Sequence, residues 1–183
     1  KVIALAGITN VVGDVRPVKE ITEFAHKNKI YVLLDAAQYI PHKKIDVQKV
    51  DVDFLAFSAH KMCGPTGVGV LYGKCELLDK MLPISYGGGM NLNFTENNIS
   101  LVEVPYKFEA GTPNISGIIS FSEAIKFLNM VSMEYIERVE SHLRKYLISE
   151  LKKIPYVKIY NENSESSIVL INIDGITSGD LGL

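Results

Sequence analysis

The sequence has few of the features that mark secreted, membrane or nucleic-acid-binding proteins. Its 183 residues include only two cysteines, Cys63 and Cys75, whereas a secreted chain of this size often carries more, in pairs. No apolar run approaches the roughly 20 residues that a membrane helix needs. Lysine and arginine form no basic block, and the formal net charge is -2. We therefore expect a protein of a reducing, cytoplasmic compartment, with neither nucleic acid nor membrane as a partner.

Metal and dinucleotide sites are not indicated either. The two cysteines and four histidines show no metal-ligand spacing, so we expect no metal site. Gly67 and Gly69 form a GxG without the rest of the dinucleotide fingerprint. His26 and His42 are expected to be plain surface residues.

Apolar runs and helical repeats alternate in the first half of the chain, which indicates an α/β fold with a mostly parallel sheet. The expected strands are Val2–Ile8, Ile30–Leu34, Val52–Phe57 and Val68–Tyr72. The near-continuous apolar run of the first strand is typical of a strand covered on both faces. A helix is expected with Pro17 in its first turn, ending near Asn28. The GPTG link before the fourth strand is too short for a helical crossover, so that strand should be antiparallel to the third.

The second half predicts a different organisation. Residues 86–112 are rich in Gly and Asn without a clear period, which favours a long loop. Two helices (116–130 and 133–153) and two strands (157–160 and 168–173) follow. We expect a partial large domain over 1–132, a linking helix over 133–154 and the truncated start of a smaller α/β domain over 155–183. Because the chain starts on a buried strand and stops without a closing element, we expect an internal piece of a longer protein.

Polar residues gather where the expected strands end. They are Asn10 after the first strand, Asp35 and Gln38 after the second, and Ser58, His60 and Lys61 after the third. Ligands of open α/β sheets bind beyond the carboxyl ends of the strands. An aldehyde cofactor needs an amine nucleophile, a protonated pyridine needs a carboxylate, and a phosphate needs hydrogen-bond donors. The set therefore fits pyridoxal 5'-phosphate (PLP), although Asp35 could also serve as a cap of the following turn.

Four longer motifs carry a family resemblance. They are ITNVVGDVRPVKEI (8–21), LLDAAQ (33–38), SAHKMCGPTGVGVLYG (58–73) and KFEAGTPN (107–114). Together they resemble the cysteine desulfurases, PLP enzymes of fold type I within the class V aminotransferase superfamily. The resemblance is to the group that mobilises sulfur for iron–sulfur clusters, and it covers essentially the whole chain. The implied fold is the large domain of PLP-dependent transferases.

The resemblance implies a role for each candidate residue. Lys61 would hold PLP as a Schiff base and later move the substrate's α-proton, and His60 is the second catalytic candidate. Asp35 would pair with the pyridinium nitrogen and Gln38 with the ring's phenolic oxygen. The remaining cofactor-binding candidates are Ser58 and His60 at the phosphate, Asn10 near the cofactor and substrate carboxylate, and Thr112 at the phosphate of a partner subunit's cofactor. A homodimer with shared sites is therefore implied.

The implied reaction removes sulfur from L-cysteine, leaving L-alanine and an enzyme persulfide that a sulfur-acceptor protein could take. The family's catalytic cysteine, early phosphate loop and substrate-binding arginine have no counterpart in this chain, and the family usually has arginine where Lys107 stands. Neither Cys63 nor Cys75 matches the catalytic cysteine. We therefore expect the isolated chain to be inactive. The alternatives are another class V aminotransferase, a selenocysteine lyase, or a non-catalytic piece with a structural or pairing role.

Overall fold

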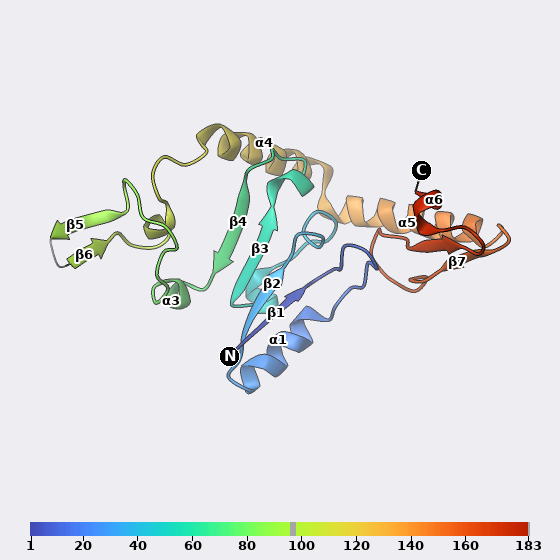
Figure 1. Ribbon diagram of the computed structural model, residues 1–183, viewed down its shortest axis with the longest axis horizontal. Coiled ribbons are helices and arrows are strands. Elements are labelled where there is room, and N and C mark those ends of the chain that lie inside the picture. Colours follow the sequence, from blue (N-terminus) through green and yellow to red (C-terminus); the bar gives the residue numbers. More distant parts are fainter. Residues whose placement is uncertain (96–97, 183) are drawn as a thin grey trace.

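A four-stranded sheet forms the centre of the protein in the computed structural model, which describes residues 1–95 and 98–182 (Figure 1). Its strands are β1 (Val2–Ala6), β2 (Tyr31–Asp35), β3 (Phe54–Ser58) and β4 (Gly69–Gly73), in that order across the sheet. β1, β2 and β3 are parallel, and β4 is antiparallel to β3. This confirms the expected α/β fold and the expected direction of the fourth strand.

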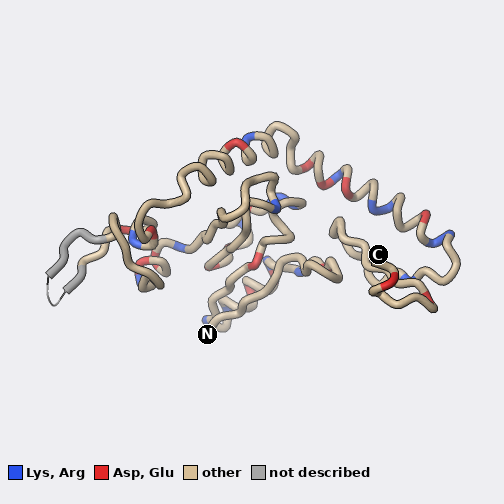
Figure 2. Tube along the Cα trace, turned by 45° about the horizontal axis from the view of Figure 1, so that its top comes forward, with Lys and Arg blue, Asp and Glu red and all other residues tan. Residues whose placement is uncertain are grey.

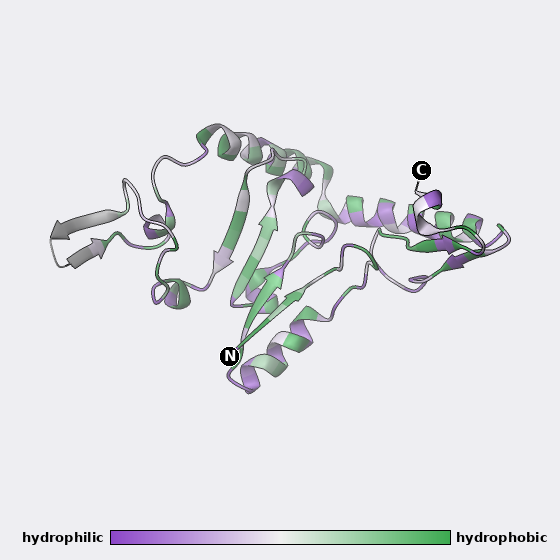
Figure 3. Ribbon diagram, viewed as in Figure 1, coloured by the Kyte–Doolittle hydropathy of each residue, from purple (hydrophilic) through white to green (hydrophobic). Residues whose placement is uncertain are grey.

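One face of the sheet forms the main core. The helices α1 (Val18–Lys27) and α2 (Val47–Val50) pack with it, and the apolar strands stand out in Figure 3. The side chains of Val32, Leu34 and Leu55 are buried there. α1 ends near Asn28 as predicted, but Pro17 occupies the cap position before the helix and not its first turn.

The opposite face of the sheet is not covered by the described residues, which corrects the expectation that β1 is buried on both sides. Val2, Tyr31 and Leu71 keep 60%, 44% and 54% of their surface exposed. Alternate side chains of a strand point to opposite faces, so a strand that is apolar throughout needs two covering layers. The described residues supply one.

A buried carboxylate joins the amino-terminal ends of β2 and β3. Asp53 accepts hydrogen bonds from the backbone N–H of Val32 at 2.7 Å and from Nε2 of His26 at 2.9 Å. Lys74 Nζ lies 3.1 Å from Asp53 Oδ1 and 2.8 Å from Asp51 Oδ1. His26 is therefore not the plain surface residue that the sequence indicated. Burial alone would raise the pKa of Asp53, but the bonds from His26, Val32 and Lys74 outweigh it and hold this pKa below its ordinary value.

Residues 86–112 are not one long loop, contrary to prediction. They contain the antiparallel hairpin of β5 (Asn91–Thr95) and β6 (Asn98–Leu101), followed by a 3-10 turn, η2 (Tyr106–Phe108). The hairpin projects at the end of the molecule opposite α5 (Figure 1). NLNFT alternates polar and apolar residues, which is the period of a strand. The surrounding Gly-rich and Asn-rich composition concealed that short signal.

Two consecutive helices, α4 (Ile115–Val131) and α5 (Met133–Leu151), confirm the predicted pair. α4 packs against the end of β3, where the ring of Phe121 lies 6.3 Å from that of Phe57. α5 carries charges of both signs along its length (Figure 2). One of them, Glu140, lies 2.8 Å from Nδ1 of His42, so His42 is also not a plain surface residue.

The last residues form the antiparallel pair β7 (Val157–Ile159) and β8 (Ile171–Ile173), then α6 (Ser178–Leu181). A further short helix, α3 (Cys75–Leu78), follows β4. One helix gives way to the next near residue 132, and helix gives way to strand after residue 154. The division into domains stays a prediction. None of the described helices is both long and apolar enough to cross a membrane.

Candidate functional site

A cavity of about 260 Å³ lies at the carboxyl ends of β1 and β2, with Lys61 on its wall. Its lining consists of Ala6, Ile8, Thr9, Asn10, Asp35, Ala37, Gln38 and Lys61. Four side chains that the sequence singled out are thus brought together: Asn10, Asp35, Gln38 and Lys61. This is the rim at which open α/β sheets bind ligands.

Asp35 has a local structural task as well as a place in the cavity. Its Oδ1 accepts a hydrogen bond from the backbone N–H of Ala37 at 2.9 Å, which begins the turn that carries Gln38. Ala36 is fully buried, and its own N–H bonds to the carbonyl of Ala56 in β3. Over 1–95 and 98–182, the second carboxylate oxygen of Asp35 accepts no hydrogen bond from protein. One oxygen therefore orders the turn while the other can serve a ligand.

Lys61 is presented by a short anchored turn, η1 (Ala59–Lys61), directly after β3. Ala59 is fully buried, and its carbonyl accepts hydrogen bonds from the N–H groups of Met62 and Gly64. A Cβ on Gly64 would lie 2.8 Å from Phe121 and 2.9 Å from the Ala59 carbonyl, so only glycine fits. The buried residues fix the turn, while Lys61 itself stays exposed at the cavity.

The other three predicted residues do not line this cavity. Ser58 is the half-buried last residue of β3, paired with Gly69, and His60 is exposed beside Lys61. Thr112 is exposed in the segment before α4. Its neighbour Gly111 donates its N–H to the carbonyl of Gly88, which fixes this segment to the glycine-rich loop. The phosphate roles of Ser58, His60 and Thr112 stay predictions.

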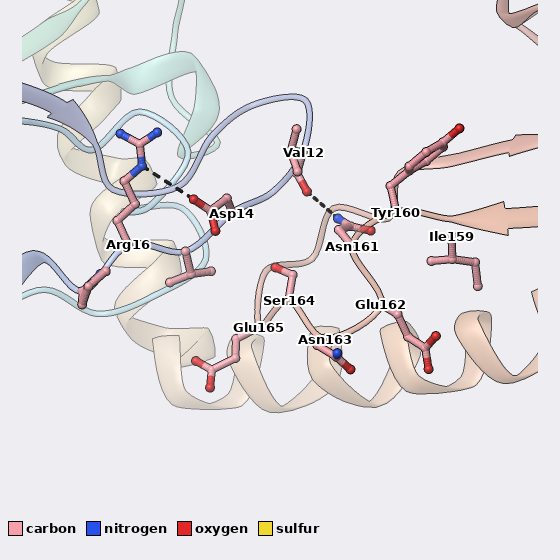
Figure 4. A pocket seen from close by; sticks show the side chains of 12 residues that line it. Val12, Asp14, Arg16, Ile159, Tyr160, Asn161, Glu162, Asn163, Ser164 and Glu165 are labelled. Atoms are coloured by element: carbon pink, nitrogen blue, oxygen red, sulfur yellow. Dashed lines mark hydrogen bonds and ion pairs between the residues drawn. The ribbon is translucent and has the colours of Figure 1, made fainter.

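A larger hollow of about 850 Å³ lies elsewhere, between residues 12–17 and 159–165 (Figure 4). Its lining includes Arg16, Asp14, Glu162 and Glu165 but no lysine. Size alone does not identify a site. A hollow of about 750 Å³ along α5 also holds lysine, glutamate and asparagine side chains, but Lys61, Asp35 and Gln38 meet in the smaller cavity of about 260 Å³, at the carboxyl ends of the sheet strands where open α/β sheets bind ligands. We therefore take the smaller cavity as the candidate site.

Comparison with known proteins identifies the family of the chain. The family model described as "Aminotransferase class-V" matches residues 1–183. The chain belongs to the class V aminotransferase family. It is 41% identical over 181 residues to a "Probable cysteine desulfurase" of Halalkalibacterium halodurans, covering 99% of this chain and 45% of that protein. It is also 38% identical to a "Cysteine desulfurase" of Haloferax volcanii, covering 99% of this chain and 43% of that protein.

The structural comparison gives the same family and the same coverage. The crystal structure of the cysteine desulfurase CsdA from Escherichia coli superposes with a TM-score of 0.93 at 35% identity, covering 99% of this chain and 45% of that one. This confirms the predicted fold and the resemblance to cysteine desulfurases. The chain spans a little under half the length of these relatives.

Lys107 is the position where we expected this class V aminotransferase to depart from its family. It is buried, and its Nζ donates a hydrogen bond to the carbonyl of Asp79 at 2.8 Å. The same ammonium lies 5.1 Å from the ring centre of Phe108. A single carbonyl acceptor suits a point donor such as lysine and does not need the fork of arginine. In this chain Lys107 thus ties η2 to the residue after α3.

Sequence reasoning missed Thr9 as a cavity residue. Its Oγ1 accepts the N–H of Asp14 at 3.0 Å, and its backbone bonds to Gly13 and Asp14 close the turn after β1. The available signal was the sequence TNVVGD, in which a hydroxyl precedes a glycine and an aspartate at turn spacing.

Proposed function

We propose that this chain is the cofactor-binding part of a PLP-dependent cysteine desulfurase. The observation that carries the proposal is the meeting of Lys61, Asp35 and Gln38 in one cavity at the strand ends. Class V aminotransferases are PLP-dependent, and the relatives described above are named as cysteine desulfurases.

The side chains of the cavity fit PLP chemically. Lys61 offers the amine that an aldehyde requires, and the free oxygen of Asp35 favours a protonated pyridine nitrogen. Gln38 offers an amide donor for the ring's phenolic oxygen. Ser58 ends β3 and His60 lies beside Lys61 in the following turn, and both would supply donors to the phosphate. Bound PLP would supply an electron sink for the bonds at the α-carbon of an amino acid.

The remaining roles concern the substrate. Lys61 would take the α-proton of L-cysteine and return a proton to the product, and Asn10 would face the substrate carboxylate. In the balanced reaction, L-cysteine and a thiol give L-alanine and a persulfide, so the sulfur leaves carbon and joins the thiol. Cys63 and Cys75 do not match the position of the family's reacting cysteine. We therefore propose that the reacting thiol is outside these residues, and that the whole protein works as a homodimer with Thr112 near the partner's site and passes sulfur to an acceptor protein.

Titration of the purified chain with PLP tests the proposal. We expect a saturable absorbance band near the visible edge, because the aldehyde combines with the amine of the cavity. We also expect no release of alanine or sulfide when L-cysteine and a thiol are added. A chain that gives no band does not hold the cofactor, and the proposed role would then be wrong for these residues. Measurable turnover would instead contradict the expected inactivity.

A further inference from the structure

The turn that brings Asn10 and Thr9 to the cavity is held from the other side by residues far away in sequence. Within the turn, the N–H of Gly13 bonds to the carbonyl of Thr9 at 3.1 Å, and the N–H of Thr9 bonds to the carbonyl of Asp14 at 3.1 Å. The outer edge of the turn, at Val12 and Gly13, contacts residues 161–168 (Figure 4).

Asn161 is the centre of this contact. It is only 8% exposed, and its Nδ2 donates hydrogen bonds to the carbonyls of Val12 and Ile168. Its Oδ1 accepts the N–H of Leu170 at 2.9 Å. The side chain therefore uses its donors and its acceptor to join the turn after β1 to the segment before β8.

Two serines complete the contact at Gly13. Ser164 Oγ donates a hydrogen bond to the carbonyl of Gly13. Gly13 has φ +68, and a Cβ there would collide with Ser166 Oγ. Ser166 is only 3% exposed. This packing leaves no room for a side chain at position 13, so the turn after β1 and residues 161–168 lie in close contact.

The holding segment is itself fixed to α5. Arg144 is buried, and its guanidinium donates hydrogen bonds to the carbonyls of Asn161, Ser164 and Ile168. These bonds are strong because the donor is charged. Burial lowers the pKa of Arg144 from its ordinary range, yet an arginine remains charged at neutral pH. Asn161 therefore contacts the turn from a segment that is itself anchored to α5.

We propose that Asn161 is a positioning residue of the candidate site, which holds the 9–14 turn so that Asn10 stays at the cavity wall. The inference rests on the proposed function, since it assigns Asn161 a task toward the same PLP cavity. It adds a residue 151 positions away from Asn10 (161 minus 10), in the segment between β7 and β8. The distal part of the chain would then contribute to cofactor binding without touching the cofactor.

Hydrogen exchange on the cofactor-free chain provides the first test. In Asn161→Ala, the amides of Thr9, Gly13 and Asp14 should exchange about tenfold faster, because the turn opens locally more often. The amides of Val32 and Leu34 in the core should keep their protection, which shows that the variant folds. Asn163→Ala is the matched control, since Asn163 is exposed on the same segment and makes none of these bonds to the turn. Unchanged exchange at residues 9–14 in Asn161→Ala would overturn the proposal.

PLP affinity provides the second test, in a cycle with Asn10→Ala. Asn161→Ala should weaken PLP binding several-fold in the wild-type background and produce no further loss when Asn10 is already alanine. An equal loss in both backgrounds would mean that Asn161 does not act through Asn10, and the proposal would fail. If the wild-type chain takes up no PLP, the proposed function fails instead, whereas exchange at residues 9–14 still decides whether Asn161 holds the turn.

Discussion

Replacement of Lys61 by alanine should abolish the absorbance band that PLP gives with the wild-type chain. An aldehyde can combine with any accessible amine, but a stable and saturable complex needs further contacts to the ring. Lys61 is the lysine that shares a cavity with Asp35 and Gln38. We therefore expect the saturable band to disappear in Lys61→Ala, leaving only the weak, non-saturating reaction of surface lysines.

The matched control for this experiment is Lys80→Ala. Lys80 is exposed after α3 and does not line the cavity. Its loss should leave both the amplitude of the band and the apparent dissociation constant for PLP unchanged. A band that survives in Lys61→Ala would place the reacting amine elsewhere and would remove the main support for the candidate site.

The second large effect is expected on stability. Asp53→Ala should lower the free energy of unfolding by about 3–4 kcal/mol, in the range found when one partner of a buried ion pair is removed. The side chain of Asp53 is 5% exposed and bonds to three groups from α1, β2 and the residue after β4. Its loss leaves the N–H of Val32 buried without that acceptor. Urea unfolding followed by circular dichroism measures the change.

Asp51→Asn is the control within the same cluster, because asparagine tolerates the left-handed backbone of residue 51 (φ 55) and the change removes the charge. Asp51 contacts His26 and Lys74 as Asp53 does, but its side chain is 61% exposed. Exposed ion pairs contribute about 0–1 kcal/mol, so this variant should unfold close to the wild-type midpoint. Equal losses for the two variants would show that burial of Asp53 is not what makes it important.

The same cluster makes the free energy of unfolding depend on pH in a defined direction. The pKa of Asp53 is lower in the folded chain than in the unfolded one, so its contribution is complete above about pH 4 and is lost as pH falls further. Burial acts to lower the pKa of Lys74, but the bonds and charges of Asp51 and Asp53 raise it overall. The contribution of Lys74 is therefore present at neutral pH and is lost above about pH 10. Asp53→Asn should flatten the acid limb of the curve of stability against pH.

The sheet could be predicted because its signal is local. β2 and β3 are short apolar runs that end in Asp35 and Ser58, and their carboxyl ends fall within one residue of the expected positions. Parallel strand ends meet at one edge, so the order of the strands in the sequence is enough to expect Asp35 and Lys61 together. The β5–β6 hairpin was missed because its strands lie in a Gly-rich and Asn-rich stretch, whose composition favours a loop.

The polar contacts between distant segments could not be predicted in the same way. Asp53 bonds to His26, which lies 27 residues away, and His42 pairs with Glu140, which lies 98 residues away. Nothing in the local sequence identifies such partners. Asn161 stands in the run NENSESS, whose composition is typical of a solvated loop. Its burial results from the packing of this run against the turn after β1, which no local pattern encodes.

The order of strands across the sheet has a consequence for how the chain can fold. Spatial order follows chain order, so each new strand pairs with the one made just before it. During synthesis the sheet can therefore grow one strand at a time, because each pairing needs only the one segment that connects consecutive strands. The Asp53 cluster is completed when Lys74 arrives directly after β4. The rim that carries Asp35 and Lys61 can thus form early, before α5 and the Asn161 segment are in place.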